Sequence, residues 1–158
     1  MLAGDTTIAV GRRILAKPED EADLRRMLAL LSGRRHHCLS AVCLIGADGK
    51  ARTRISDTVV AFKRLNQAEI DWYVACGEGM GKAGGYAIQG KAEAFVRYLA
   101  GSHSGVVGLP VFETRALLES AGYSLCKRRK MTKNAYAFSR PEVDRFLTHK
   151  LLKLHNLP

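Results

Sequence analysis

The stretch HHCLSAVCLIGADGKARTRISDTVVAFKRL, residues 36–65, decides the fold of this 158-residue chain. Both halves are rich in β-branched and apolar residues, which favour extended strands. Between the halves, Asp48-Gly49 is a dipeptide typical of tight hairpin turns. The sequence therefore predicts one long antiparallel hairpin, with strands over residues 36–46 and 51–63.

Helices are predicted on both sides of this hairpin. Pro18 fits the first position of a helix whose acidic first turn suits the helix dipole, and Gly33 fits its C-terminal cap. A second helix is expected from the N-cap Asn66 to about Gly77. A third is expected over residues 110–121, before Gly122.

Two shorter segments favour strands. Residues 6–10, TTIAV, are β-branched, and residues 92–101 are ambiguous between helix and strand, where we favour the strand. Residues 141–158 have the apolar spacing of a last helix. Strands and helices in this order predict a mixed α/β domain, with a twisted sheet, the long antiparallel hairpin and flanking helices.

Composition points to a soluble protein. Hydrophobic residues make up 47% of the chain and charged residues 25%, which is ordinary for a globular domain. No apolar run approaches the roughly 18 residues of a membrane span, and the first residues lack the pattern of a signal peptide. The four cysteines form no C-x-x-C pair, so we expect free thiols and a cytoplasmic location.

The net charge of +10 is unevenly spread. Residues 123–158 carry nine Lys and Arg against two acidic residues, whereas the rest of the chain is nearly balanced. The sequence therefore predicts a domain over residues 1–122 and a basic C-terminal tail over residues 123–158. Such a tail is the one feature that favours nucleic acid as a partner.

The glycine-rich stretch GMGKAGGYAIQG, residues 79–90, contains a G-x-G-x-x-G spacing. A dinucleotide site needs a strand before this spacing and a helix after it, and here a helix is expected before it. The Walker A pattern also fails, because Ala83 follows Gly81-Lys82. Lys82 among glycines remains a candidate phosphate contact, and the alternative is an ordinary connector with a solvated lysine.

Other candidate residues are weak when taken singly. Asp5 could hold a divalent metal or take a proton from water, or it could simply form a turn. Lys17 lies where a helix N-terminus is expected, which favours an anion there, although a solvated lysine is the simpler alternative. Gln89 could read a nucleobase edge. The adjacent residues His36-His37-Cys38 would point to opposite faces of a strand, so a structural role is favoured over a metal site.

Four motifs, taken together, are more informative. GDTTIAVGRRILAKP, LSGRRHHCLSAVCLI, KAGGYAIQGKAEAFV and GSHSGVVGLPVFET occur in this order. Together they closely resemble the Maf family of nucleoside triphosphate pyrophosphatases, over roughly residues 2–123. The resemblance implies a Maf/inosine-triphosphatase-like fold and the hydrolysis of nucleoside triphosphates to monophosphate and pyrophosphate, with a divalent metal, Mg²⁺ or Mn²⁺.

The resemblance also implies roles for five residues. Asp5 would be the proton acceptor and a candidate metal ligand. Thr6 and Gln89 would read the base, as in the subgroup that prefers dTTP and UTP. Lys17 and Lys82 would contact the phosphates, and the resemblance leaves a homodimer open.

This sequence also departs from the family pattern. Members of the family have an S-x-S-P-R-R phosphate loop before the motif that contains Asp5, and this chain starts at Met1. Gly4 replaces an alanine, and His103 and Gly105 stand where Tyr and Asn are common. We therefore expect an N-terminally truncated domain whose activity is weak unless the missing segment is supplied. The alternative is a catalytically degenerate protein that binds nucleotides, or RNA through its basic tail.

Overall fold

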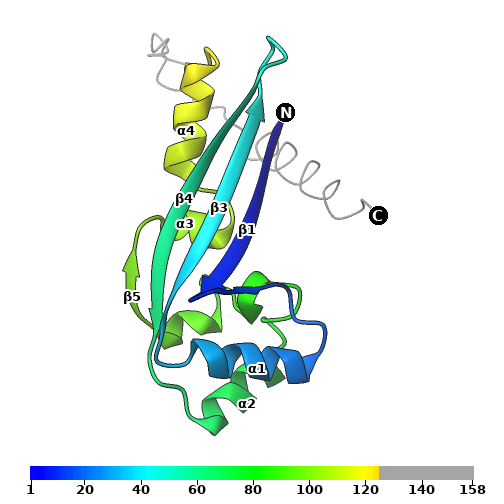
Figure 1. The fold of residues 1–158 in the computed structure, drawn as a ribbon, viewed down its shortest axis with the longest axis vertical. Helices are drawn as coiled ribbons and strands as arrows, with labels where there is room; N and C mark the ends of the chain where they lie inside the picture. The colour runs from blue at the N-terminus through cyan, green and yellow to red at the C-terminus, as the bar shows by residue number, and fades with distance from the viewer. Residues whose placement is uncertain (125–158) are drawn as a thin grey trace, which may run out of the picture. The chain divides into compact units, whose positions relative to one another are not determined.

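A computed structural model describes residues 1–124 (Figure 1). The chain divides into two units, Met1–Leu125 and Cys126–Pro158. The helix predicted over residues 141–158 lies outside the described residues. So does nearly all of the predicted basic tail, and the boundary between residues 122 and 123 stays a prediction.

In the described part of the chain, five strands form one sheet in the order β2-β1-β3-β4-β5. All four pairings between neighbouring strands are antiparallel. With the helices around it, the sheet confirms the mixed α/β class. The strands are β1 (Leu2–Val10), β2 (Arg13–Leu15), β3 (Arg35–Ile45), β4 (Ala51–Phe62) and β5 (Val96–Ala100). The helices are α1 (Glu21–Leu31), α2 (Gln67–Ala75), α3 (His103–Val107) and α4 (Val111–Ser120), with 3₁₀ turns η1 (Ala83–Gly85) and η2 (Lys91–Phe95).

The predicted hairpin is confirmed as the pair β3 and β4. Its register runs without interruption from Arg35 opposite Ala61 to Ile45 opposite Ala51. Along β3, buried residues alternate with more exposed ones, so one face of the strand points into the protein. The sequence predicts this strand from its apolar content and the Asp48-Gly49 turn, and the structure adds which of its two faces is buried.

The buried face of β3 meets a different partner along each third of its length (Figure 1). At one end, Cys38 belongs to the main core with residues of α1, α2 and the 3₁₀ turns. In the middle, buried Ser40 contacts α3 through a hydrogen bond. At the other end, Val42 and Leu44 pack against Leu117 of α4.

Helix α2 begins where the sequence predicts. The Asn66 side chain accepts a hydrogen bond from the Glu69 backbone N–H (2.9 Å), and the Glu69 carboxylate accepts one from the Asn66 N–H (3.0 Å). This reciprocal capping box satisfies two N–H groups that the helix itself cannot pair. Helix α4 over Val111–Ser120 also agrees with the prediction.

Other predicted boundaries are wrong. Helix α1 has Asp20 as its N-cap, with the carboxylate accepting from the Asp23 N–H (2.7 Å), so Pro18 lies before the helix. The strand predicted over residues 92–101 is a 3₁₀ turn followed by β5. Strand β2 and helix α3 were not predicted. Both are short, and pairing with the rest of the fold holds them in place.

Candidate functional site

Asp5 and Thr6 lie in the middle of β1, opposite Ala41 and Ser40 of β3. Their side chains point to opposite faces of the strand, because neighbouring residues in a strand alternate. Strand β2 pairs only with Ile8–Val10, so within residues 1–124 the other edge of β1 is unpaired beside Asp5 and Thr6. A ligand that lies along this free edge can reach side chains from both faces.

The Asp5 carboxylate is exposed and only partly engaged. Its Oδ1 accepts a hydrogen bond from the Thr6 backbone N–H (2.9 Å), which orients the group. Among the described residues, Oδ2 accepts no hydrogen bond and Asp5 forms no ion pair. One carboxylate oxygen therefore remains available to a water molecule or a cation.

Thr6 belongs to a short chain of hydroxyl groups. Its Oγ1 lies 2.9 Å from Ser40 Oγ, and Ser40 Oγ donates its single proton to the carbonyl oxygen of Gly105 in α3. Thr6 must therefore be the donor in its bond with Ser40. The Thr6 oxygen keeps lone pairs that can accept a hydrogen bond from a ligand.

Lys17 and Lys82 lie on two loops that the backbone joins directly. The Gly84 N–H, two residues after Lys82, donates to the carbonyl oxygen of Ala16, beside Lys17 (2.9 Å). Both lysines are exposed. Because α1 begins after Asp20, Lys17 does not stand at a helix N-terminus, and the argument from the helix dipole does not apply to it.

Gly84 also fixes the Lys82 loop against β1. Its φ is +69°, and a Cβ atom built on it would lie 2.8 Å from Ile8 Cγ1. No residue other than glycine fits both the backbone conformation and the space. The loop therefore lies on the Ile8 side of β1, the same face as Thr6 and opposite to Asp5.

Gln89 is exposed and follows buried Ile88. Its loop is held on both sides, since the Ala87 N–H donates to the Tyr73 hydroxyl (3.1 Å) and the Lys91 N–H donates to Glu78 (2.7 Å). Within residues 1–124, no hydrogen bond joins Gln89 to Thr6 or Asp5.

Behind the glycine loop lies a buried pair that the sequence analysis missed. The Tyr86 hydroxyl lies 2.9 Å from His36 Nε2, and the buried His36 Nδ1 has no hydrogen-bond partner among residues 1–124. Burial, together with neighbouring His37, lowers the pKa of His36 to about 4. The histidine is therefore neutral at physiological pH and anchors Tyr86. The only signal in the sequence was an inward position on the hairpin.

The His36-His37-Cys38 run alternates between the two faces of β3, as its place on a strand predicts. His36 and Cys38 are buried, whereas His37 points outward and its Nδ1 lies 2.8 Å from Asp57. In residues 1–124, no three His, Cys, Asp or Glu side chains are grouped so as to hold a metal ion. Nor does that part of the chain contain a helix long and apolar enough to cross a bilayer.

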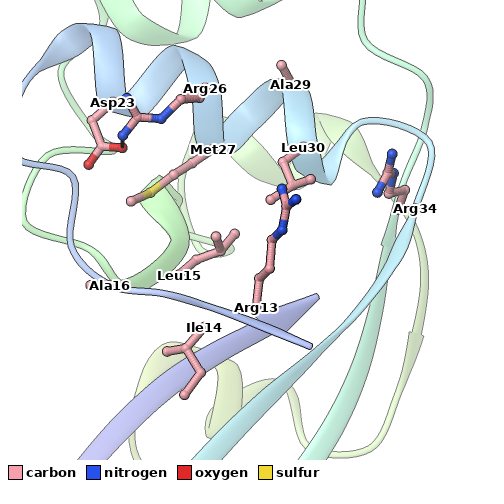
Figure 2. Close-up of a pocket in the computed structure, with 10 residues that line it drawn as sticks. All are labelled: Arg13, Ile14, Leu15, Ala16, Asp23, Arg26, Met27, Ala29, Leu30 and Arg34. Carbon is pink, nitrogen blue, oxygen red and sulfur yellow. Dashed lines mark hydrogen bonds and ion pairs between the residues drawn. The ribbon is translucent and has the colours of Figure 1, made fainter. Parts of the chain in front are cut away.

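A hollow of about 710 Å³ opens between β2 and α1 (Figure 2). Arg13, Arg26 and Arg34 line it, and Arg26 is paired with Asp23. Ala16 also lines it, next to Lys17, but none of the five predicted site residues does. Those residues lie on the free edge of β1 and on exposed loops instead.

Comparison with known proteins gives one family. The sequence profile described as "Maf-like protein" matches residues 1–121. This range includes all four motifs of the sequence analysis and all five predicted site residues.

Individual relatives are also similar. A "dTTP/UTP pyrophosphatase" of Sphingopyxis alaskensis is 75% identical over 125 residues, which cover 79% of this chain and 66% of the relative. Proteins of the same name from Novosphingobium aromaticivorans and Zymomonas mobilis are 61% and 55% identical, over 77% and 79% of this chain. The aligned parts cover 61% and 62% of these two proteins. The chain thus spans less than two thirds of each relative's length.

Proposed function

This chain belongs to the family of Maf-like proteins, and on that premise we propose that it takes part in the hydrolysis of nucleoside triphosphates, dTTP and UTP first, to monophosphate and pyrophosphate. The observation that carries the proposal is its 75% identity over 125 residues to a protein named for that activity. Because the chain spans less than two thirds of such relatives, its own activity is part of the proposal.

The two lysine loops support the phosphate part of the proposal. The hydrogen bond between Ala16 and Gly84 keeps the loops of Lys17 and Lys82 together, on the face of β1 that carries Thr6. Two ammonium groups are suitable counter-charges for a triphosphate. Their attraction to the oxygens is strongest where negative charge develops during reaction.

Asp5 supports the proton-transfer part. Its free carboxylate oxygen would accept a proton from water as the water oxygen forms a bond to the α-phosphorus. The bond from the α-phosphorus to the bridging oxygen then breaks, and pyrophosphate leaves with the electron pair. Since Asp5 and the lysines lie on opposite faces of β1, the triphosphate would cross the free edge of the strand.

Asp5 also suits a divalent cation. Mg²⁺ is commonly held by one or two carboxylates together with water and substrate phosphates, and the free oxygen of Asp5 fits that donor set. Bound there, Mg²⁺ or Mn²⁺ would supply neutralisation of the phosphate charge.

Thr6 and Gln89 support the preference for thymine or uracil. Each of these bases presents one N–H donor between two carbonyl acceptors. Thr6 Oγ1 offers an acceptor because its proton is given to Ser40, and the Gln89 amide offers both a donor and an acceptor.

The test uses the full 158-residue chain and Asp5→Asn, with Lys50→Gln as a matched control in the hairpin turn. Release of pyrophosphate is measured with dTTP, UTP, CTP and ATP in the presence of Mg²⁺ or Mn²⁺. We expect weak release that prefers dTTP and UTP, is lost in Asp5→Asn and is retained in Lys50→Gln. Equal release by Asp5→Asn would refute Asp5 as the base, and no release with any triphosphate would refute activity of this chain.

Three expectations stay predictions: a homodimer, a cytoplasmic location and nucleic-acid binding through the basic tail. Deletion of residues 124–158 would test the tail. If the tail binds RNA, the deletion should abolish binding that weakens steeply with salt. Sedimentation of the full chain would show whether it forms a dimer.

A further inference from the structure

A second hollow, of about 610 Å³, is lined mainly by cationic residues. Its lining comes from three separate segments of the chain: the turn after α1, the segment after β4, and β5. We call it the arginine hollow. It is formed by Ser32, Gly33, Arg34, Lys63, Arg64 and Arg97.

The backbone fixes these three segments to one another. The Gly33 N–H donates to the Lys63 carbonyl (3.0 Å), and the Lys63 N–H donates to the Phe95 carbonyl (2.8 Å). The Leu65 N–H donates to Ser32 Oγ (2.8 Å). Leu65 and Phe95 are buried, so the hollow rests on the core and its cationic residues start from fixed positions.

The charge in the hollow is not balanced by nearby acids. Lys63 is paired with Glu69. Arg34, Arg64 and Arg97 are exposed, and none of them forms an ion pair with an acidic residue in the described part of the chain. The negative end of the α1 dipole stabilises a cation at Arg34, but it does not explain why Arg64 and Arg97 also lie in the hollow.

Ser32 adds a neutral donor. Its oxygen accepts from Leu65, while its own proton has no acceptor among residues 1–124. Guanidinium groups bind phosphate oxygens through two parallel hydrogen bonds, and a hydroxyl group complements them. Several such donors around one hollow can bind more oxygens than a single anion offers, so they suit a compact ligand with linked phosphates.

We propose that the arginine hollow is a second anion site, separate from Lys17 and Lys82, that binds two or three linked phosphates. The ligand is either an inorganic polyphosphate or the phosphate chain of a nucleotide, and the chemistry of recognition is the same for both. Arg34 also lines the hollow drawn in Figure 2, so the basic surface continues towards Arg13. The proposal does not depend on hydrolysis at Asp5.

The test is calorimetric titration of the full chain with pyrophosphate, tripolyphosphate and dTTP. To isolate the site, it uses a background in which Lys17 and Lys82 are changed to Ala. Each of Arg34→Gln, Arg64→Gln and Arg97→Gln should weaken tripolyphosphate binding about tenfold or more, the loss expected for one charge-assisted contact. Arg54→Gln is the matched control. Arg54 is exposed on β4, nine residues before Lys63, or roughly 30 Å along an extended strand.

Each outcome decides the proposal. If tripolyphosphate and dTTP bind with equal affinity, the phosphate chain is the recognised group. If tripolyphosphate binds more tightly than dTTP, the site prefers an inorganic ligand. No binding, or an equal loss in Arg54→Gln, would overturn the site, because general charge would then account for the data. A twelve-nucleotide DNA that binds much more tightly than tripolyphosphate, and loses this binding in Arg34→Gln, would also overturn it in favour of a nucleic-acid surface.

Discussion

Replacement of Gly84 by alanine should destabilise the protein far more than the same change at Gly81. Both glycines have left-handed backbone conformations, with φ of +69° at Gly84 and +71° at Gly81. They differ in their surroundings. A Cβ on Gly84 would lie 2.8 Å from Ile8 Cγ1 and 3.0 Å from Ile8 Cγ2, whereas nothing lies within 4 Å of a Cβ on Gly81.

The two substitutions therefore share one cost and differ in another. A left-handed alanine costs about 1–2 kcal/mol, partly offset by the lower entropy of the unfolded chain. Overpacking in a filled core costs about 1–3 kcal/mol more, and only Gly84→Ala has this cost. We expect the free energy of unfolding to fall by about 1 kcal/mol for Gly81→Ala and about 3 kcal/mol for Gly84→Ala.

Urea denaturation measures this difference. With a slope of about 1.5 kcal/mol per molar urea, the two midpoints should differ by about 1.3 M. The double variant Gly84→Ala/Ile8→Ala gives an independent check, because shortening Ile8 removes Cγ1 and Cγ2 and leaves only its Cβ, 3.0 Å from the added atom. Its destabilisation should be smaller than the sum of the two single effects, as expected for residues in direct contact.

Equal midpoints for Gly81→Ala and Gly84→Ala would refute the reasoning, and so would strict additivity with Ile8→Ala. Either result would mean that the glycine loop does not rest on β1. The loop of Lys82 would then have no fixed relation to the strand that carries Thr6.

Three further predictions concern single residues. The pKa of His36 is lowered from 6.5 to about 4 in the folded protein, so between these pH values the unfolded chain binds a proton that the folded protein does not. The free energy of unfolding should therefore fall by about 3 kcal/mol as the pH drops from 6.5 to 4. The urea midpoint of His36→Gln should lose most of this pH dependence. Asn66→Ala removes the N-cap of α2 and should lower the free energy of unfolding by about 1 kcal/mol, while Asn66→Asp should retain most of it, as thermal denaturation will show. Thr6→Val should weaken UTP binding by about tenfold and leave CTP binding unchanged, since cytosine has no N–H at the ring position between its two substituents. Equal losses for both nucleotides in a titration would contradict the proposed contact between Thr6 and the base.

Local patterns predicted much of the fold. The hairpin was readable because the apolar and β-branched content of its strands and the Asp48-Gly49 turn are both properties of the local chain. The start of α2 was readable for the same reason, since the capping group of Asn66 lies within its own turn. The first residues of β1 were missed because Gly4 and Asp5 are poor strand formers, and pairing with β3 holds them extended.

The site was less readable, because its geometry comes from contacts between distant segments. The motifs indicated Lys17 and Lys82, but not that a hydrogen bond between Ala16 and Gly84 joins their loops. Alternation along β1 could have shown that Asp5 and Thr6 face opposite ways. The buried pair of His36 and Tyr86 depends on a contact across 50 residues, which no local pattern reveals.

The hydroxyl chain from Thr6 through Ser40 to Gly105 has a fixed direction. A row of hydroxyl groups that ends in solvent can reverse all its hydrogen bonds at once, but a carbonyl oxygen at one end can only accept. Thr6 is therefore locked as an acceptor towards its open side, in a way that no titration can switch. The Gly105 carbonyl of α3 would thus control which bases Thr6 can bind, although this five-residue helix does not itself need to contact the base.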